Sequence, residues 1–268
     1  MPEDVCIRMH PPTVGAGILC IDGGGIRGTM PLQIMKRIQD RIALPIPLQR
    51  FIKVAFGISS GGLIVADMFI NGSSIEDSSD KFEALAKHVF QRRKYANASF
   101  LPKFLTGLLP LLIDSLPPLP SFLYLMDIAV SYFTDGLYPS RNMEDALKRV
   151  FSSDRSMLGI SNATVTGTLV GLPAATVDKR PKCRIFSNYH GGDQDSRPKE
   201  GDRQPRLWEI ARAISAAPGV FPPQHINGVG TFQDAGPLEN DPLISALTAA
   251  ATAFPLLEEP DFVVSLGT

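Results

Sequence analysis

Residues 55–63 read AFGISSGGL, in which two serines stand among three glycines between two apolar runs. The spacing Gly57-x-Ser59-x-Gly61 is the nucleophile-elbow pattern, in which a serine is exposed at a sharp turn from a strand into a helix. Glycine is favoured where such a turn leaves no room for side chains. The pattern is centred on Ser59, because position 58 is isoleucine. The alternative is a glycine-rich turn whose Ser59 or Ser60 only caps the following helix.

Strand-like and helix-like segments alternate on both sides of this turn. Short apolar runs predict strands over residues 17–21, 51–56, 163–170, 183–189 and 261–266. Apolar residues at helical spacing predict helices over residues 31–42, 60–70, 207–217 and 241–253, with further helices across 80–150. This alternation predicts an α/β fold with a central, largely parallel sheet flanked by helices.

The composition limits the possible compartments and partners. A chain of 268 residues with 44% hydrophobic content suits one large domain. A net charge of −1 gives no electrostatic case for nucleic acid. Three scattered cysteines without a CxxC pair predict neither a disulfide framework nor a zinc site, and favour a reducing, cytoplasmic compartment. The apolar region 100–133 is broken by prolines and two aspartates, so it does not read as a membrane span.

The domain boundaries follow from the first and last strands. Residues 1–16 are expected to form an N-terminal extension, polar and proline-bearing and unlike a secretory signal. Residues 17–268 are expected to form the single domain. The last predicted strand is followed by nothing that could cover the sheet beside it. The sequence therefore predicts a fragment or an excised domain of a longer protein.

A second glycine cluster, DGGGIRG at residues 22–28, follows the first predicted strand. Its GxGxxG spacing fits a dinucleotide-binding loop. That fold places an acid about 20 residues further on, and the sequence there, IALPIP, has none. The other interpretation is an oxyanion hole, in which backbone N–H groups face the negative charge that develops on an ester carbonyl. This interpretation pairs naturally with a nucleophilic serine at the end of the next strand.

Two residues are candidates for the base that a serine nucleophile needs. His225 could serve in a Ser-Asp-His arrangement, with an acid between it and Ser59 as its partner. Asp234, between an aromatic residue and a small-residue turn, could instead hold a carboxylate at a loop tip and take the proton directly. The alternative for Asp234-Ala235-Gly236 is an Asx turn without catalytic meaning.

Three blocks together resemble the signature of the patatin-like phospholipases: DGGGIRG at 22–28, GISSGG at 57–62 and DAG at 234–236. Three further stretches agree with that family in the same order: WEIARAISAAP at 208–218, FPP at 221–223 and SLGT at 265–268. The resemblance extends from about residue 17 to the end of the chain. The chain departs from the family in having Asp-Ala-Gly where Asp-Gly-Gly or Asp-Gly-Ala is common.

The resemblance implies an α/β fold with a Ser–Asp dyad and no metal or other cofactor. By position, Ser59 would be the nucleophile and Asp234 the proton acceptor. Gly23, Gly24, Gly25 and Arg27 would form the oxyanion hole.

The implied activity is calcium-independent hydrolysis of acyl esters in glycerophospholipids or related glycerolipids. The implied partner is a lipid at a membrane or aggregate surface, with peripheral association and no nucleic acid. The alternatives are a dinucleotide-binding module and a catalytically silent patatin-like scaffold domain.

One apolar segment bears on access to lipid. Residues 104–113 are strongly apolar, and Arg92-Arg93-Lys94 lies just upstream. This combination favours either docking on an anionic lipid surface or a lid or core helix pair buried against the sheet.

Overall fold

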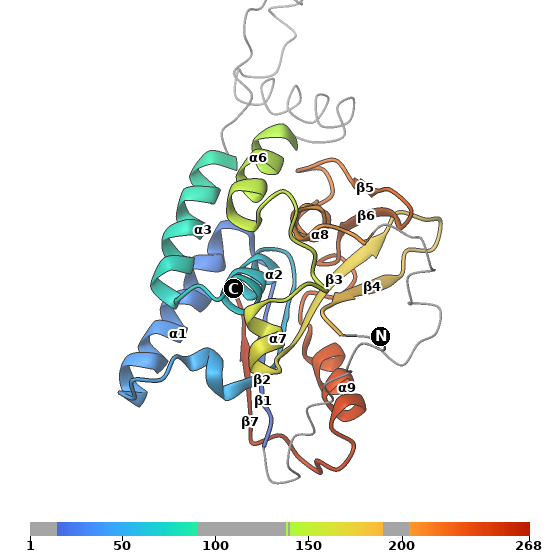
Figure 1. The fold of residues 1–268 in the computed structure, drawn as a ribbon. Coiled ribbons are helices and arrows are strands. Elements are labelled where there is room, and N and C mark those ends of the chain that lie inside the picture. The colour runs from blue at the N-terminus through green and yellow to red at the C-terminus, as the bar shows by residue number, and fades with distance from the viewer. Residues whose placement is uncertain (1–14, 90–137, 139, 190–203) are drawn as a thin grey trace, which may run out of the picture.

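The computed structural model describes residues 15–89, 138, 140–189 and 204–268. Its centre is a seven-stranded sheet in the order β5-β6-β3-β2-β1-β7, with β4 paired to β3 (Figure 1). The strands are β1 (Gly17–Ile21), β2 (Ile52–Gly57), β3 (Leu169–Thr176), β4 (Cys183–Ser187), β5 (Gln224–Ile226), β6 (Gly230–Asp234) and β7 (Phe262–Leu266).

The sheet is mixed, with a parallel centre. Strand β1 pairs in parallel with both β2 and β7, and β2 pairs in parallel with β3. Strands β4 and β6 are antiparallel to β3, and β5 is antiparallel to β6. The predicted α/β fold with a largely parallel sheet is therefore confirmed, and an antiparallel part is added on the β3 side.

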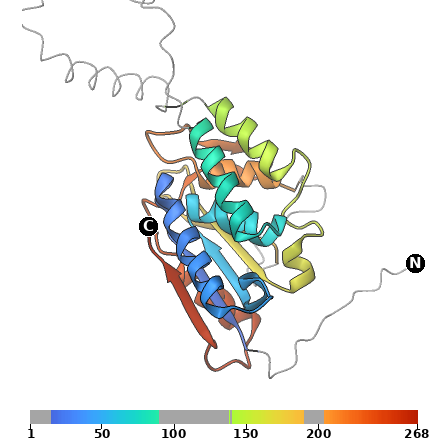
Figure 2. The same cartoon turned by 90° about the vertical axis from the view of Figure 1, so that its left-hand side faces the viewer.

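Helices cover both faces of this sheet. They are α1 (Thr29–Ile42), α2 (Ser60–Val65), α3 (Ile75–Val89), α6 (Ser140–Phe151), α7 (Asn162–Thr166), α8 (Leu207–Ile214) and α9 (Leu243–Ala253). Three single turns join them: η1 (Gly25–Gly28), η2 (Leu48–Phe51) and the π-helical η3 (Ala66–Asn71). Helix α9 packs on one face, while α1 and α3 lie side by side on the other (Figures 1 and 2).

The alternation of side chains along β1 divides the core into two layers. Leu19 and Ile21 belong to the larger cluster, which includes residues of α1, α2, α3, α6 and α8. Ile18 and Cys20 point the other way and pack with residues of α9. Successive side chains of a strand point to opposite faces, so a strand buried on both faces is apolar throughout. This burial explains the uninterrupted run GILCI and holds its carboxyl end rigidly beside the glycine loop.

The strand predicted over residues 163–170 is partly wrong. Residues 162–166 form α7, and β3 begins only at Leu169. Ser161 and Thr164 form a capping box, in which the backbone N–H of each residue donates to the hydroxyl of the other. This local bonding outweighs the strand preference of the β-branched residues. Gly167, at φ 71°, then ends the helix.

Other predicted elements are close to those observed, and some were missed. The helix predicted over 60–70 is α2 followed by the π-helical turn η3. The hairpin of β5 and β6 was not predicted. The apolar segment 104–113 and the basic residues 92–94 lie outside the described residues. In the part of the chain that the structure describes, no helix is long and apolar enough to cross a membrane.

Candidate active site

The turn at Ser59 has the backbone geometry of a strained elbow. Ser59 has φ 52° and ψ −121°, a conformation that costs a residue with a side chain about 1–3 kcal/mol. The neighbouring glycines explain how the turn fits. A Cβ atom on Gly57 would lie 2.4 Å from the carbonyl oxygen of Gly61, and one on Gly61 would lie 2.4 Å from that of Ile21. The elbow is therefore pressed against the end of β1, and only glycine fits at these two positions.

Asp234 ends β6 and lies at the same edge of the sheet as the elbow. It is 4% exposed, so the expectation of a carboxylate at a loop tip is wrong: the side chain is buried at a strand end. Burial raises the pKa of the Asp234 carboxyl, while a hydrogen-bonding interaction with the Ser59 side chain and the N–H of Gly236 lower it. The Gly236 N–H donates to Oδ1 at 2.9 Å. The same carboxylate therefore forms an Asx turn and interacts with Ser59.

The turn after Asp234 does not require glycine at its second position. Among the described residues, the non-glycine residues with positive φ are Ala43, Ser59 and Ser152. Ala235 is not one of them, and it is fully buried. The departure from Asp-Gly-Gly is therefore compatible with this backbone conformation.

The glycine loop lies directly beside the elbow. A Cβ atom on Gly23 would lie 3.0 Å from the Cβ of Ser59. The peptide unit that joins Gly23 to Gly24 is held at both ends. Its N–H, on Gly24, donates to Ser60 Oγ at 3.1 Å, and its carbonyl, on Gly23, accepts from Thr268 Oγ1 at 2.9 Å. This peptide is therefore fixed in orientation.

The middle of the loop, residues 25–27, is exposed to solvent. Gly25 has φ 60°, and a Cβ atom there would meet nothing within 4 Å. Arg27 is exposed on η1, and its Nε donates to the carbonyl of Gly24 at 3.5 Å. The structure thus brings Gly23 next to Ser59, while Arg27 folds back onto the outside of the loop.

His225, the other candidate base, lies elsewhere. It is exposed on β5, where its Nδ1 is 2.9 Å from Thr231 Oγ1. It pairs across the hairpin with Thr231, three residues before Asp234, which corresponds to roughly 10 Å along a strand. The structure therefore brings Asp234 to Ser59 and does not bring His225 there.

Three polar residues beside the site were not among the predicted catalytic or oxyanion-hole residues. Ser60 and Thr268 hold the glycine loop. The Oδ1 of Asn240 would lie 2.7 Å from a Cβ atom on Gly23 and 3.5 Å from one on Gly236, so Asn240 is next to both loops. The available signals were the second serine of the GISSGG block and the terminal SLGT block. No spacing rule pointed to Asn240.

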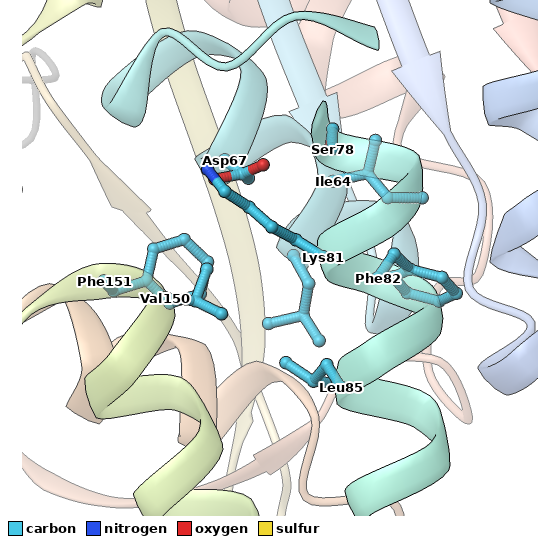
Figure 3. A pocket seen from close by; sticks show the side chains of 9 residues that line it. Ile64, Asp67, Ser78, Lys81, Phe82, Leu85, Val150 and Phe151 are labelled. Atoms are coloured by element: carbon cyan, nitrogen blue, oxygen red, sulfur yellow. The ribbon is translucent and has the colours of Figure 1, made fainter. Parts of the chain in front are cut away.

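A small pocket lies among α2, η3, α3 and the end of α6 (Figure 3). Its apolar walls include Leu63 and Ile64 of α2, and the charged pair Asp67–Lys81 lies at 3.2 Å in its lining. Asp67 Oδ1 also accepts from Asn71 and Ser73, which ties the turn η3 together. The cavity is about 20 Å³, room for one water molecule. It is therefore too small to hold an acyl chain.

The described residues offer no metal site at this edge. No group of three or more histidine, cysteine, aspartate or glutamate side chains among them is placed to hold a metal ion. The chemistry of the described site is that of hydroxyl, carboxylate and backbone N–H groups.

Comparison with known proteins identifies the family of this chain. The family model of the patatin-like phospholipases matches residues 19–247. The human calcium-independent phospholipase A2-gamma is 24% identical over 260 residues, covering 96% of this chain and 29% of the relative. Phospholipase A I of Arabidopsis thaliana is 24% identical over 290 residues, covering 96% of this chain and 21% of the relative. The chain thus spans less than a third of the length of either relative.

Two solved bacterial structures are distantly similar. VipD from Legionella pneumophila has a TM-score of 0.41 at 15% identity, with 85% of this chain and 47% of that chain covered. The ExoU–SpcU complex of Pseudomonas aeruginosa has a TM-score of 0.39 at 17% identity, with 78% and 37% covered. The family match spans most of the chain and includes the elbow, the glycine loop and Asp234. The chain therefore belongs to the patatin-like phospholipase family.

Proposed function

We propose that the protein is a serine lipid acyl hydrolase of the phospholipase A type. The observation that carries the proposal is the strained Ser59 elbow, with a buried carboxylate on one side and a glycine loop on the other. A family whose members are phospholipases supports acyl esters of glycerophospholipids or related glycerolipids as the substrate class.

In the proposed first step, Ser59 Oγ attacks the ester carbonyl and its proton passes to Asp234. Burial keeps Asp234 in a weakly solvated environment, which makes its carboxylate a stronger base than an exposed aspartate. The proton returns to the leaving alcohol when the tetrahedral intermediate collapses. Water then attacks the acyl-serine and gives its proton to Asp234, which passes it to Ser59 Oγ as the acyl–oxygen bond breaks and the fatty acid is released.

In this proposal the glycine loop stabilises the negative charge that develops on the carbonyl oxygen. Because Ser60 already accepts from the N–H of Gly24, the open Gly25 is the better candidate donor in the conformation described here. Gly23 gives the substrate close access to Ser59, since any side chain there would meet Ser59 itself. Arg27 supports the loop from its exposed side. A single donor of this kind is worth roughly 10²–10³ in rate.

The proposed setting is a lipid at a membrane or aggregate surface, with the protein cytoplasmic and peripherally associated. The boundaries proposed for the catalytic domain remain residues 17–268. No cofactor takes part in the proposed reaction.

The test is labelling by a fluorophosphonate probe, with the modified peptide identified by mass spectrometry. We expect the wild type to be labelled at Ser59 and Ser59→Ala to lose both labelling and phospholipid hydrolysis. Ser60→Ala is the comparison variant: it removes the neighbouring hydroxyl that accepts from Gly24, so we expect labelling at Ser59 to persist and hydrolysis to be reduced but measurable. Labelling that survives Ser59→Ala would overturn the assignment. A folded wild type that takes no label but binds a nicotinamide dinucleotide tightly by calorimetry would support the dinucleotide alternative.

A further inference from the structure

The exposed face of α1 and η1 carries apolar side chains where a surface helix ordinarily has polar ones. Ile26, Met30 and Ile34 are 62%, 52% and 40% exposed. They follow one another at intervals of four residues, so they form one stripe along the helix. The opposite face of α1 is already buried through Leu32 and Met35. The stripe is therefore not needed for packing within the described fold.

Basic residues continue the same stripe. Arg37 and Arg41 lie three and seven residues beyond Ile34, which keeps them on its side of the helix, and both are exposed. Among the described residues, the ion pair of α1 is made by Lys36 with Glu76, and it leaves these arginines out. Asp40 is the acidic residue nearby. An apolar stripe followed by arginines is suited to bind a layer that has an apolar interior and anionic groups at its surface.

The stripe also begins at the site. Ile26 lies one residue after Gly25 in η1, and Gly23 at the other end of the loop adjoins Ser59. Figure 2 shows α1 running along the outer side of the molecule. The stripe therefore starts in the same glycine loop that adjoins Ser59.

We propose that the stripe Ile26–Met30–Ile34, extended by Arg37 and Arg41, docks the protein on an anionic phospholipid surface. The proposal rests on the proposed lipid hydrolase function and names the surface that presents the substrate to Ser59. The apolar side chains enter the boundary between headgroups and acyl chains, and the arginines contact the phosphates. The charge of the stripe favours a lipid surface over a second copy of this chain, because two copies would bring like charges together.

The test measures binding to vesicles by flotation, in a Ser59→Ala background so that no lipid is consumed. Vesicles of phosphatidylcholine alone are compared with an equal mixture of phosphatidylcholine and phosphatidylglycerol. We expect the double variant Met30→Gln/Ile34→Gln to weaken binding to the mixed vesicles at least about tenfold, since both substitutions remove apolar surface that would be buried in the lipid. The matched control is Ile160→Gln, which changes a 91% exposed isoleucine on another surface. That control is expected to bind as the background does.

A second pair of variants tests the charge. Arg37→Gln/Arg41→Gln is expected to weaken binding to the mixed vesicles by about fivefold for each arginine and to leave binding to phosphatidylcholine unchanged. The control is Lys179→Gln/Arg180→Gln, on the exposed turn after β3. Circular dichroism confirms that each variant is folded.

Two outcomes would overturn the proposal. One is vesicle binding by the stripe variants that equals that of their controls. The other is a change in oligomeric state by sedimentation velocity with vesicle binding intact, which would assign the stripe to contact between copies. Neither outcome depends on hydrolysis, so a failure here is distinct from a failure of the Ser59 assignment, which probe labelling reports.

Discussion

At the scale of single residues, Asp234 is buried, although its proposed role as general base requires a negatively charged carboxylate. The fold raises the pKa of its carboxyl, so the folded protein holds this proton more tightly than the unfolded chain does. The protonated carboxyl therefore adds to the free energy of unfolding at low pH. This contribution is full below the ordinary aspartate pKa and is lost as the pH rises through the raised pKa of the folded protein. The role proposed for Asp234 is therefore expected to reduce stability at neutral pH.

The corresponding variant is Asp234→Asn, which keeps an oxygen acceptor for Gly236 and cannot take up a proton. We expect kcat to fall by about 10²–10⁴, the usual range for loss of a general base. We expect its midpoint of thermal unfolding to exceed that of the wild type at neutral pH, with the gap closing near pH 4, about the ordinary aspartate value. The acid limb of wild-type activity should lie above that ordinary value.

His225→Gln is the control for this prediction, because His225 is exposed and bonded to Thr231. We expect kcat to stay within about threefold of wild type, since general-base loss costs far more. A loss as large as that of Asp234→Asn in a folded protein would favour the histidine as base.

At the scale of elements, the elbow shows how local propensity and packing can oppose each other. Gly61 lies in α2, where replacement by alanine would stabilise an isolated helix by about 1 kcal/mol. In this fold its Cβ would lie 2.4 Å and 2.6 Å from the carbonyl oxygens of Ile21 and Asp22, which are fixed in the backbone at the end of β1. We therefore expect Gly61→Ala to lower the free energy of unfolding by about 1–3 kcal/mol, measured by urea denaturation.

The control is Gly159→Ala, where the new Cβ would lie 3.4 Å from the nearest backbone oxygen, that of Ser156. Its stability is expected to change by less than about 0.5 kcal/mol. Gly61→Ala at wild-type stability would mean that the elbow can move away from β1.

The elements also show what sequence patterns can and cannot predict. Strands β1, β2 and β7 are predicted to within one residue, because each reads as a short apolar run. For β1 and β2 that run reflects burial on both faces. Strand β7 is apolar although it lies at the edge of the sheet and is mostly exposed. The strand prediction is wrong at residues 163–168, where the capping box of Ser161 stabilises a helix. The hairpin of β5 and β6 was missed, since a three-residue strand after two prolines carries too little pattern. Asp234 was found by its motif, while its burial in a strand end follows from tertiary packing.

At the scale of the whole molecule, the site joins segments from the two ends of the chain. Residues 22–25 follow β1, residues 58–62 follow β2, Asp234 ends β6, and Thr268 follows β7. The parallel pairing of β7, β1 and β2 places three of these ends at one edge of the sheet. Neighbouring parallel strands are joined by long connections, so their ends meet only once the sheet has formed. The spacing of these segments in the sequence therefore could not predict that they lie together.

The contact between Thr268 and Gly23 tests whether this assembly matters for the reaction. Thr268→Val keeps the shape of the side chain and removes the hydrogen bond to the Gly23 carbonyl. Such a bond is worth about 0.5–1.5 kcal/mol. Because the Gly23–Gly24 peptide is then held only by Ser60, the glycine loop should lose its fixed orientation beside Ser59. We expect kcat to fall by roughly 2–12-fold, which is that energy expressed as a rate, with KM little changed.

The control for Thr268→Val is Ser265→Ala on the exposed side of β7, which is expected to leave kcat unchanged. Ser60→Ala removes the other hydrogen bond of the same peptide, and the double variant with Thr268→Val completes a cycle. Two hydroxyls that hold one peptide should give losses that are not additive. Additive losses would show that the two hydroxyls act independently and not through one shared peptide. A Thr268→Val variant with wild-type kcat would show that the orientation of this peptide is set by the turn itself, and that the end of β7 stabilises the fold without affecting the reaction.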